Sequence, residues 1–531
     1  MQVVRLEMST YITYILPILF IFLTVLLLLL ILFKLFFKLR NNLRQRLLTR
    51  SIPGPSTWDF IKIILRTREP EKIFNFITDI FRKYENTLFK VWLGPYLCIF
   101  PTNPEYIKEM LIHPKIQKKG IFYSSVRNSF IGNSLGTIDD TTIWKRHRNA
   151  VACCFKTNNL KYCVSIMNSY ADNISQHIQN NRNMNSNECE IFNPIVTMAR
   201  RSIIKALFGV EMNSDERKEI VENIEISTEI IVHKILNPWF LNKYLYRFSS
   251  LKKTEEKSKR IICTHLDNII RIIDQTRKQS MDHNFNEENI SKECFDLEKK
   301  SLIETLLENG KMTLDEIRQE TVFSLLTIRT VAFTNTCIIF YLAQNQDFQK
   351  KVFEEQLAIF SKGNPDRRPS YEDLQQMKFL EQVIYETLRL QTPLPIMSRR
   401  IEEDVIIGNT ILPAGAFVCF NLKDLHRSPL YYKDPENFNP DHFSMIECQK
   451  RHPYAFIPFS GGLKNCVAYR LVILQIKITL STLVRKSKFF PSDKYSSTEF
   501  PKLKYSISST FENGCYVKLE PRQKSSLNVE C

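Results

Sequence analysis

Apolar residues recur at spacings of three and four along much of this chain, as they do on the buried face of an α-helix. Helices are therefore predicted over 191–208, 220–235, 261–273 and 373–390. Residues 314–342 are apolar nearly all round at their centre, which predicts a long buried helix. Alternating residues at 88–100 predict a β-hairpin, and shorter strands are expected between 400 and 420. The polar, irregular stretch 277–300 predicts a surface loop.

The amino end carries a different pattern. Residues 11–33 contain no charge and are rich in Leu, Ile and Phe, and a helix of that length spans a bilayer core of roughly 30 Å. A cleaved signal peptide fits poorly, because the apolar run is too long and no small-residue cleavage site follows it. Lysine and arginine dominate 34–52, so the positive-inside rule predicts a single anchor with 1–10 lumenal and the rest of the chain cytosolic.

The remainder is predicted to be one large domain that is mainly α with a small β region. Apolar residues make up 44% and charged residues 24% of the 531-residue chain, which is typical of a protein with a substantial core. The prolines at 53 and 55 are expected to end the helix that follows the anchor. We find no linker that divides 53–520, and 521–531 is assigned as a tail.

The net charge narrows the classes of partner, and the cysteine pattern indicates the redox compartment. The formal net charge is +17, but the basic residues are spread along the chain and form no nucleic-acid-binding motif, so we expect no nucleic-acid partner. Attraction to an anionic leaflet and docking of an acidic protein both remain open. Thirteen cysteines at irregular spacings argue against a disulfide framework and agree with a reducing compartment.

One cysteine has surroundings suited to metal ligation. Cys466 ends the stretch Phe-Ser-Gly-Gly-Leu-Lys-Asn-Cys at 459–466, and an apolar, helix-like run at 471–483 follows it. Glycine lets a backbone approach a flat cofactor, while nearby N–H groups, a helix N-terminus or a cation such as Lys464 would lower the pKa of the thiol. The alternative is a buried, inert cysteine, which is the commoner fate of a single Cys.

The order Phe-x-x-Gly-x-basic-x-Cys-x-small resembles the heme-ligand loop of cytochromes P-450, the heme-thiolate monooxygenases. The resemblance implies that Cys466 is the axial ligand of the iron of heme b and that Phe459, Gly462 and Lys464 shape the cofactor site. Lys464 stands where the family usually has arginine, and Ala468 stands where it has glycine.

A second motif supports the same resemblance. Glu386 and Arg389 lie three apart on one helix face, as in the helix-K Glu-x-x-Arg of the family, and Pro435–Phe443 is similar to the segment that follows. In the family a second arginine joins this buried pair beneath the heme. Here His442 takes its place, and because histidine lacks a guanidinium fork the resemblance implies a weaker lock.

Further matches implicate contacts to the heme propionates. Trp144 and Arg148, four apart on one helix face, resemble the helix-C Trp-x-x-x-Arg, and the resemblance implies that both reach one heme edge. Arg399 matches another propionate contact of the family.

The long helix departs most from the family pattern. Thr330 falls on the threonine whose hydroxyl assists proton delivery, but Arg329 replaces its acidic partner and Thr327 replaces a glycine. Arginine cannot pass a proton at neutral pH and is costly to bury unpaired. Arg329 therefore turns to solvent, pairs with an acid not identified by sequence, or occupies the site. Thr330 itself is either catalytic or structural, bonding back to a helix carbonyl.

Within cytochromes P-450 the chain is most similar to the microsomal fourth family, known as fatty-acid ω-hydroxylases with many insect members. The supporting stretches are 236–241, 301–307 and 315–320. Many members of that branch have a glutamate that esterifies the heme. Leu326 stands at that position, so no covalent attachment is expected.

The resemblance implies an endoplasmic-reticulum monooxygenase that takes electrons from NADPH through a membrane-bound reductase and oxidises an apolar small molecule. Candidate docking cations for the reductase are Arg146, Lys156 and Arg470, and candidate substrate contacts are Leu394, Ile396, Met397 and Thr510. Two alternatives remain. The departures at 327, 329, 442, 464 and 468 suit a heme-thiolate protein with impaired O₂ activation, acting as a ligand-binding or isomerase-like protein. A single-span scaffold without a cofactor is the third.

Overall fold

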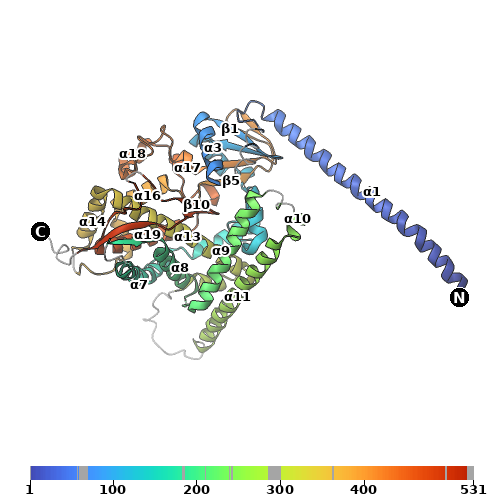
Figure 1. The fold of residues 1–531 in the computed structure, drawn as a ribbon. Coiled ribbons are helices and arrows are strands. Elements are labelled where there is room, and N and C mark those ends of the chain that lie inside the picture. Colours follow the sequence, from blue (N-terminus) through green and yellow to red (C-terminus); the bar gives the residue numbers. More distant parts are fainter. Residues whose placement is uncertain are drawn as a thin grey trace.

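The computed structural model shows a helical body joined to a smaller β-sheet region, with one long helix projecting from the sheet side (Figure 1). The mainly α fold class expected from the sequence is confirmed. The structure describes residues 2–56, 58, 62, 70–181, 186–209, 211–237, 240, 243–284, 300–361, 364–496 and 499–522.

The α-helices of these residues are α1 (Gln2–Leu48), α3 (Pro70–Lys83), α4 (Pro104–Ile112), α5 (Ile121–Val126), α6 (Thr141–Cys153), α7 (Thr157–Asn180), α8 (Phe192–Phe208), α9 (Ser214–Leu236), α10 (Lys243–Arg247), α11 (Ser250–Asn284), α12 (Leu302–Asn309), α13 (Leu314–Gln344), α14 (Gln346–Phe360), α15 (Tyr371–Gln376), α16 (Lys378–Leu390), α17 (Leu422–Leu425), α18 (Met445–Lys450) and α19 (Tyr469–Lys486). Short irregular helical turns are η1 (Pro114–Ile116), η2 (Arg127–Ile131), η4 (Pro440–Phe443), η5 (Pro453–Ala455) and η6 (Gly462–Lys464).

The strands are β1 (Leu88–Leu93), β2 (Tyr96–Pro101), β3 (Lys118–Lys119), β4 (Glu188–Glu190), β5 (Ile396–Arg400), β6 (Val405–Ile407), β7 (Thr410–Leu412), β8 (Phe417–Asn421), β9 (Ser487–Pro491), β10 (Leu503–Tyr505), β11 (Ser509–Phe511) and β12 (Tyr516–Pro521). The largest sheet has the order β1-β2-β8-β5-β3. Its first two strands are the predicted hairpin, which is confirmed. In the last pair, Lys119 lies opposite Arg399.

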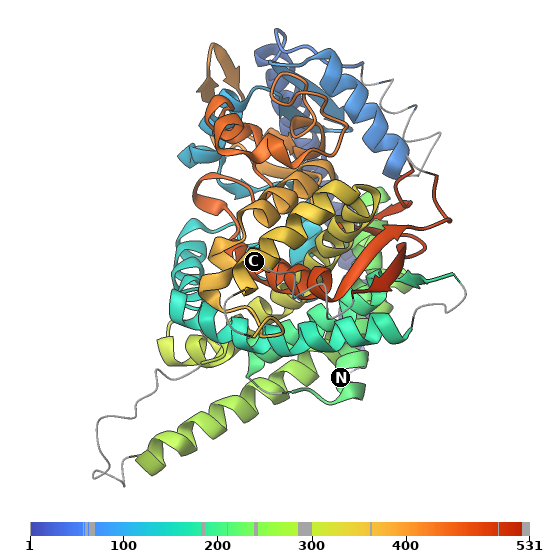
Figure 2. The ribbon, with the colours of Figure 1, turned by 90° about the vertical axis from the view of Figure 1, so that its left-hand side faces the viewer.

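Helix α13 runs through the middle of the helical body. It starts at a capping box made by Thr313 and Glu316, and its centre is buried. This burial confirms the prediction made from its apolar pattern and explains why a helix hydrophobic enough to cross a membrane lies inside the globule. Helix α11 extends beyond the body on one side (Figure 2).

Two predicted boundaries were wrong. The single helix expected at 373–390 is two helices that meet at Met377, because the Glu355 carboxylate accepts the N–H groups of Phe379 and Leu380 and so caps a new helix start. The expected loop at 277–300 begins later, because α11 continues to Asn284. Residues 285–299 lie outside the described residues.

Helix α1 contains the predicted anchor and continues without a break through most of the basic stretch. Residues 19–48 are apolar enough to span a membrane, and the apolar side chains of this projecting helix are exposed. Its basic end is docked on the sheet region: Arg44 pairs with Asp404, and the Arg46 guanidinium lies 4.5 Å from the centre of the Trp92 ring. Part of the basic segment, for which attraction to an anionic leaflet was one explanation, therefore contacts protein. The boundaries at 10, 33, 52 and 520 stay predictions.

A buried ion pair ties α16 to the segment that leads to the cysteine loop. Glu386 and Arg389 are fully buried, with Arg389 Nε donating to Glu386 Oε2 at 2.7 Å. The guanidinium also donates to the carbonyls of Pro435 and Asn437, 3.0 Å away in the second case. Burial alone would raise the pKa of Glu386, but hydrogen bonds from Arg389 and His442 hold it below its ordinary value.

His442 also contacts the buried Glu386–Arg389 pair. Its Nδ1 lies 3.2 Å from Glu386 Oε1, and its Nε2 lies 2.7 Å from the Lys433 carbonyl. Both ring nitrogens thus face oxygen acceptors, an arrangement that the doubly protonated imidazolium satisfies fully. Histidine therefore bridges the Glu386 carboxylate, both of whose oxygens lie within 3.3 Å of Nδ1, and the Lys433 carbonyl.

Removing the charge of Glu386 should destabilise the fold strongly, because the buried Arg389 guanidinium would lose its counter-ion. We expect Glu386→Gln to lower the free energy of unfolding by roughly 3–5 kcal/mol. Glu354→Gln, on the exposed side of α14 opposite Lys350, should change it by less than about 0.5 kcal/mol. Chemical denaturation of both variants measures the difference, and equal effects would contradict the role given to the pair.

Candidate functional site

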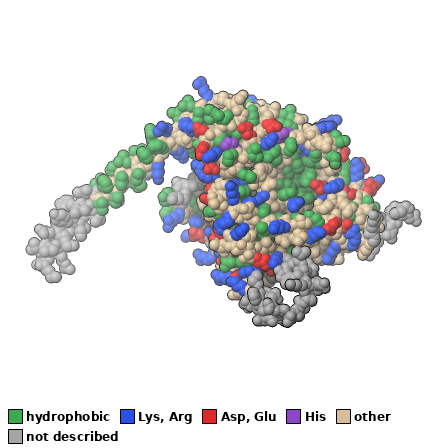
Figure 3. Space-filling model, turned by 180° about the vertical axis from the view of Figure 1, so that it is seen from behind, with side chains coloured by type: hydrophobic (Ala, Val, Ile, Leu, Met, Phe, Trp, Pro, Cys, Tyr) green, Lys and Arg blue, Asp and Glu red, His purple; other side chains and the backbone are tan. Residues whose placement is uncertain are grey.

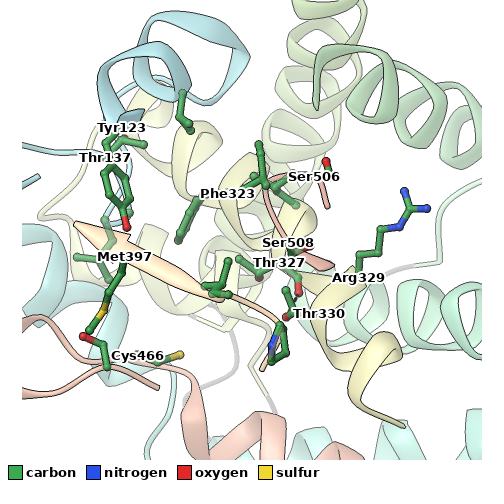
Figure 4. Close-up of a pocket in the computed structure, with 18 of the residues that line it drawn as sticks. Tyr123, Thr137, Phe323, Thr327, Arg329, Thr330, Met397, Cys466, Ser506 and Ser508 are labelled. Carbon is green, nitrogen blue, oxygen red and sulfur yellow. Dashed lines mark hydrogen bonds between the residues drawn. The ribbon is translucent and has the colours of Figure 1, made fainter. Parts of the chain in front are cut away.

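A large, mostly apolar cavity of about 1150 Å³ lies between α13, the sheet and the loop before α19. Seven of the eight catalytic and cofactor-binding residues predicted from the sequence line it: Trp144, Arg148, Thr330, Arg399, Phe459, Lys464 and Cys466. Gly462 is not among its lining residues. In Figure 4, Cys466 lies at one end of the view, Arg329 lies at the other, and Thr327, Thr330 and Ser508 lie between them.

The loop that carries Cys466 is fixed by its own backbone. The Cys466 N–H donates to the Phe459 carbonyl at 2.9 Å, closing the loop on itself. Helix α19 starts at Tyr469, two residues earlier than the apolar run predicted, so the thiol stands just before a helix N-terminus.

Gly462 serves the loop in another way than the sequence suggested. Its φ is +67°, and a Cβ there would lie 2.4 Å from the Leu111 carbonyl oxygen at the end of α4. A side chain would therefore be strained and would collide with backbone. The glycine lets the loop pack against α4, and this contact fixes the position of the loop that carries Cys466.

The electrostatic surroundings of Cys466 differ from the expectation. Burial raises the pKa of the thiol, and the Ala468 N–H and the charge of Arg148 oppose this rise without cancelling it. Lys464 is not the cation that acts on the sulfur. A buried thiol of this kind becomes a thiolate readily only when a strong positive charge, such as a metal ion, is close to it.

Lys464 belongs instead to a cluster of cations at one edge of the cavity. Its ammonium lies 4.9 Å from the centre of the Trp144 ring and is buried without a hydrogen-bond partner among the described residues. Burial and the charge of Arg399 lower the pKa of Lys464 to about 8. Arg399 is itself buried, and its Nη1 donates to the Ser398 carbonyl at 3.1 Å.

Lys119 is a member of this cluster that sequence reasoning missed. The β3–β5 register places it opposite Arg399, and burial together with the charges of Arg399 and Lys464 holds the pKa of Lys119 well below its ordinary value. Its ammonium lies 5.0 Å from the centre of the Tyr123 ring. The only local signal was the pair Lys118-Lys119, and nothing in the sequence joined it to a strand 280 residues away.

Arg148 lies nearer the cysteine. Its Nη1 donates to the Asn465 carbonyl at 2.7 Å and its Nη2 to Asn465 Oδ1 at 2.6 Å. The guanidinium thus binds the residue before Cys466 and faces the cavity at the same time. This position links α6 to the cysteine loop.

These observations fit the heme that the sequence resemblance implies. Like charges that face one another without an acid between them are unfavourable, and Asp139, a nearby carboxylate, is already paired with Arg127 at 2.5 Å. A flat group with two carboxylates would satisfy Lys119, Arg399 and Lys464, while its metal would meet the Cys466 thiol. The site lacks no residue type that such a group needs.

The cavity wall formed by α13 shows how Thr327 and Arg329, the residues that depart from the family pattern there, are accommodated. The Thr330 hydroxyl donates to the Thr327 carbonyl at 2.6 Å, the structural bond considered from the sequence. Arg329 Nη1 lies 3.3 Å from Glu225 Oε1 of α9, so of the three outcomes it pairs with an acid that the sequence did not identify. In Figure 4 the Arg329 side chain extends away from Cys466.

The predicted substrate contacts all line this cavity: Leu394, Ile396, Met397 and Thr510. Leu326 lines it too, and Pro238, Trp239 and Leu241 of one supporting stretch lie outside the described residues. Among the candidate docking cations, Arg146 is bound by the Glu316 carboxylate, whereas Lys156 and Arg470 are exposed. Basic side chains are scattered over the face seen in Figure 3 rather than gathered in one band.

The comparisons with known proteins agree with this geometry. The family model described as cytochrome P450 matches residues 52–509. Cytochrome P450 4c21 of Blattella germanica is 27% identical, covering 87% of this chain and 92% of the relative. Cytochrome P450 4d2 of Drosophila melanogaster is 26% identical over 89% and 94%, and cytochrome P450 4V2 of Pongo abelii is 25% identical over 86% and 87%.

The cation cluster predicts that one substitution has opposite effects on heme binding and on the stability of the heme-free protein. Lys119→Met should weaken heme binding by about tenfold, because a charged partner of a carboxylate is lost. The same change should stabilise the heme-free protein, because it removes a partly buried charge that Arg399 and Lys464 repel. Titration of heme into the apoprotein and thermal unfolding measure the two effects. The control is Lys118→Met, whose ammonium pairs with Glu402 at the surface, and matching results for both variants would contradict the assignment.

The lowered pKa of Lys119 also predicts a pH dependence of the heme-free protein. The folded state releases this proton at a lower pH than the unfolded chain, where lysine titrates near about 10.4. The unfolded state therefore binds more protons between these two values, and stability rises with pH in that window. In Lys119→Met this rise of stability with pH should be smaller. An identical pH dependence of stability in both proteins would contradict the lowered pKa of Lys119.

Proposed function

Because the chain belongs to the cytochrome P450 family, whose members are monooxygenases, we propose that it inserts one atom of O₂ into an apolar substrate with electrons that a reductase takes from NADPH. The observation that carries this proposal is the Cys466 thiol, which faces an apolar cavity with a cluster of cations at one edge. One of them, the Lys464 ammonium, has no hydrogen-bond partner among the described residues.

The residues of the chain have distinct tasks in this scheme. Heme bound at the site supplies the activation of O₂. Cys466 would hold its iron, while Lys119, Arg399 and Lys464 would bind its carboxylates and Trp144 would cover their edge. Arg148 holds the cysteine loop through Asn465. The Gly462 contact with α4 keeps this loop rigid, so that the sulfur keeps its direction.

The rest of the cavity binds substrate and excludes water. Its lining is mostly apolar, which favours an apolar guest through the hydrophobic effect. Leu394, Ile396 and Met397 come from the loop and strand beyond α16, and Thr510 comes from β11. Fatty acids, terpenoids and xenobiotics all suit a cavity of this size and character.

The proposed location is supported by α1. An apolar helix at the amino end fits a membrane anchor, and we place the protein in the endoplasmic-reticulum membrane with its catalytic domain in the cytosol. Lys156, between α6 and α7, and Arg470, in the first turn of α19, are exposed. They are the cations that we expect an acidic reductase surface to contact.

A second candidate function has specific support on α13. The Thr330 hydroxyl is engaged by the Thr327 carbonyl, and the residue beside it is a cation paired with Glu225. Neither group is arranged to pass a proton. A heme-thiolate protein with impaired O₂ activation, acting in ligand binding or isomerisation, is therefore the alternative to a coupled monooxygenase.

The first test concerns the sulfur. The purified protein should contain heme and show the thiolate-type absorption of its reduced carbon monoxide complex, and Cys466→Ser should abolish that absorption. Cys448→Ser changes an exposed cysteine and serves as the control, with the absorption retained. A colourless protein, or the same spectrum in Cys466→Ser, would refute the proposal.

The second test separates the two candidate functions. Arg329→Asp places an acid beside Thr330, and Glu225 keeps its pair with Arg200, 2.6 Å away. If O₂ activation is impaired, the fraction of NADPH electrons recovered in product should rise several-fold in the variant. If the wild type already couples efficiently and the substitution changes nothing, the impaired alternative is wrong and the coupled monooxygenase stands.

A further inference from the structure

The proposed reaction consumes protons, because the oxygen atom that is not inserted leaves as water. Neither Thr330 nor Arg329 is arranged to supply them, since the hydroxyl donates to a carbonyl and the guanidinium is paired. Among the described residues two carboxylates line the cavity. Glu225 is held between two arginines, whereas Glu320 of α13 is bound to a histidine. Glu320 is therefore the acid in this wall that remains for proton transfer.

A buried histidine joins Glu320 to the surface of the protein. His147 of α6 places its Nδ1 2.7 Å from Glu320 Oε1. Its Nε2 lies 3.3 Å from Oε1 of Glu316, whose side chain is 20% exposed and is bound by Arg146. An imidazole between a carboxylate at the surface and a carboxylate in the cavity wall has the layout of a proton relay.

The two carboxylates that flank His147 differ in their affinity for protons. A hydrogen bond from Arg146 lowers the pKa of Glu316 to about 2, so this group stays ionised. Burial raises the pKa of Glu320, although hydrogen bonds from His147 and from the Leu135 N–H oppose the rise. Burial alone would lower the pKa of His147, but the two carboxylates raise it above its ordinary value. A proton is therefore held at the inner end of the relay.

His147 keeps one nitrogen available for exchange. Nε2 is buried without a hydrogen-bond partner in the described part of the chain, because Glu316 is near it but not aligned with it. Transfer occurs when Nε2 takes a proton from water at the Glu316 carboxylate and Nδ1 gives one to Glu320. The imidazole is neutral before and after this step, and a turn of the ring that interchanges its nitrogens restores the starting state.

A stripe of hydroxyl groups leads from Glu320 along α13. Residues 324, 327, 330 and 334 share one face of the helix, since they are three or four apart, and all of them line the cavity. Each hydroxyl donates to a carbonyl of the same stripe: Ser324 to Glu320 at 2.9 Å, Thr327 to Ser324 at 2.8 Å, Thr330 to Thr327 at 2.6 Å and Thr334 to Thr330 at 2.9 Å. Their lone pairs remain free to accept hydrogen bonds from water.

The spacing of this hydroxyl stripe suits a file of water molecules. Glu320 and Thr330 are ten residues apart on α13, which is roughly 15 Å along a helix. Ser324 and Thr327 divide this distance into steps of about 5 Å, and one water molecule can bridge two oxygens at that separation. In Figure 4, Thr327 and Thr330 lie next to one another in the cavity wall. The hydroxyls hold the water in line and need not give up their own protons.

We propose that Glu320 is the proton donor of the cavity, that His147 recharges it from the Glu316 side, and that the hydroxyl stripe guides the water that carries the proton onward. This inference rests on the proposed function, since it names the proton source for the same reaction. The proton then enters near the start of α13 rather than from the residue beside Thr330.

Infrared spectroscopy tests the relay without turnover. In the heme-loaded, full-length protein a light-triggered caged proton lowers the pH, and the carbonyl stretch of the protonated Glu320 carboxyl reports when the proton arrives. Glu320→Gln should lack this band. His147→Gln keeps a hydrogen bond to Glu320 but cannot pass a proton, so Glu320 should become protonated about tenfold more slowly. Asp315→Asn, beside Glu316 in the first turn of α13, is the matched control and should leave the rate unchanged.

Turnover tests the donor and the stripe, with dodecanoic acid, geraniol or 7-ethoxycoumarin as the probe, whichever is oxidised. Glu320→Gln should lower the fraction of NADPH electrons recovered in product several-fold, and Glu320→Asp should restore part of it. Thr327→Val removes one hydroxyl of the stripe at constant volume and should lower the same fraction. Thr321→Val removes a buried hydroxyl of α13 that bonds to the Ile317 carbonyl and does not line the cavity, so this control should behave like the wild type.

A purely structural pair predicts a different pattern, because glutamine at 147 or 320 keeps the hydrogen bonds that join α6 to α13. Equal rates of protonation in the wild type and His147→Gln, or a wild type without the band, would overturn the relay. Unchanged recovery of electrons in Glu320→Gln would overturn the donor while the monooxygenase stands. If protonation follows the relay but no product forms from any probe, the relay stands and the proposed activity fails.

Discussion

Repulsion among buried cations is the constraint on which the site depends. The β3–β5 register sets Lys119 against Arg399, and Lys464 of the cysteine loop joins them. Asp139 is a carboxylate near both lysines, but it is paired with Arg127. The cations therefore repel one another where each has lost part of its hydration. A bound dianion would relieve this repulsion, so the sheet, the cysteine loop and the cofactor would stabilise one another.

The same reasoning applies to the thiol. Burial raises the pKa of Cys466, and one N–H group and the charge of Arg148 do not cancel this effect. The loop does not prepare a thiolate by itself, but it fixes the direction of the sulfur through the contact between Gly462 and α4. Protein packing supplies the geometry, and the charge that makes sulfur a ligand comes from the metal.

The sequence predicted features that local pattern determines. The hairpin at 88–100, the buried helix α13 and the cysteine loop each rest on residues that are neighbours in the chain. Pairings across long separations were out of reach, since no periodicity links Lys119 with Arg399, or Arg329 with Glu225. The break at Met377 was missed for the same reason, because the carboxylate that caps α16 belongs to α14.

Arg329 on α13 shows how a cation in the wall of the cavity is accommodated by a neighbouring helix. Its side chain reaches across to α9 and shares Glu225 with Arg200 of α8. Because residues 329 and 330 are about 100° apart around the helix, the Arg329 side chain extends away from Cys466 while Thr330 stays at the cavity wall. The Thr330 hydroxyl donates to the Thr327 carbonyl of its own helix. Pairing with an acid on another helix therefore makes an arginine compatible with this wall, and the group that remains beside it is a hydroxyl rather than an acid.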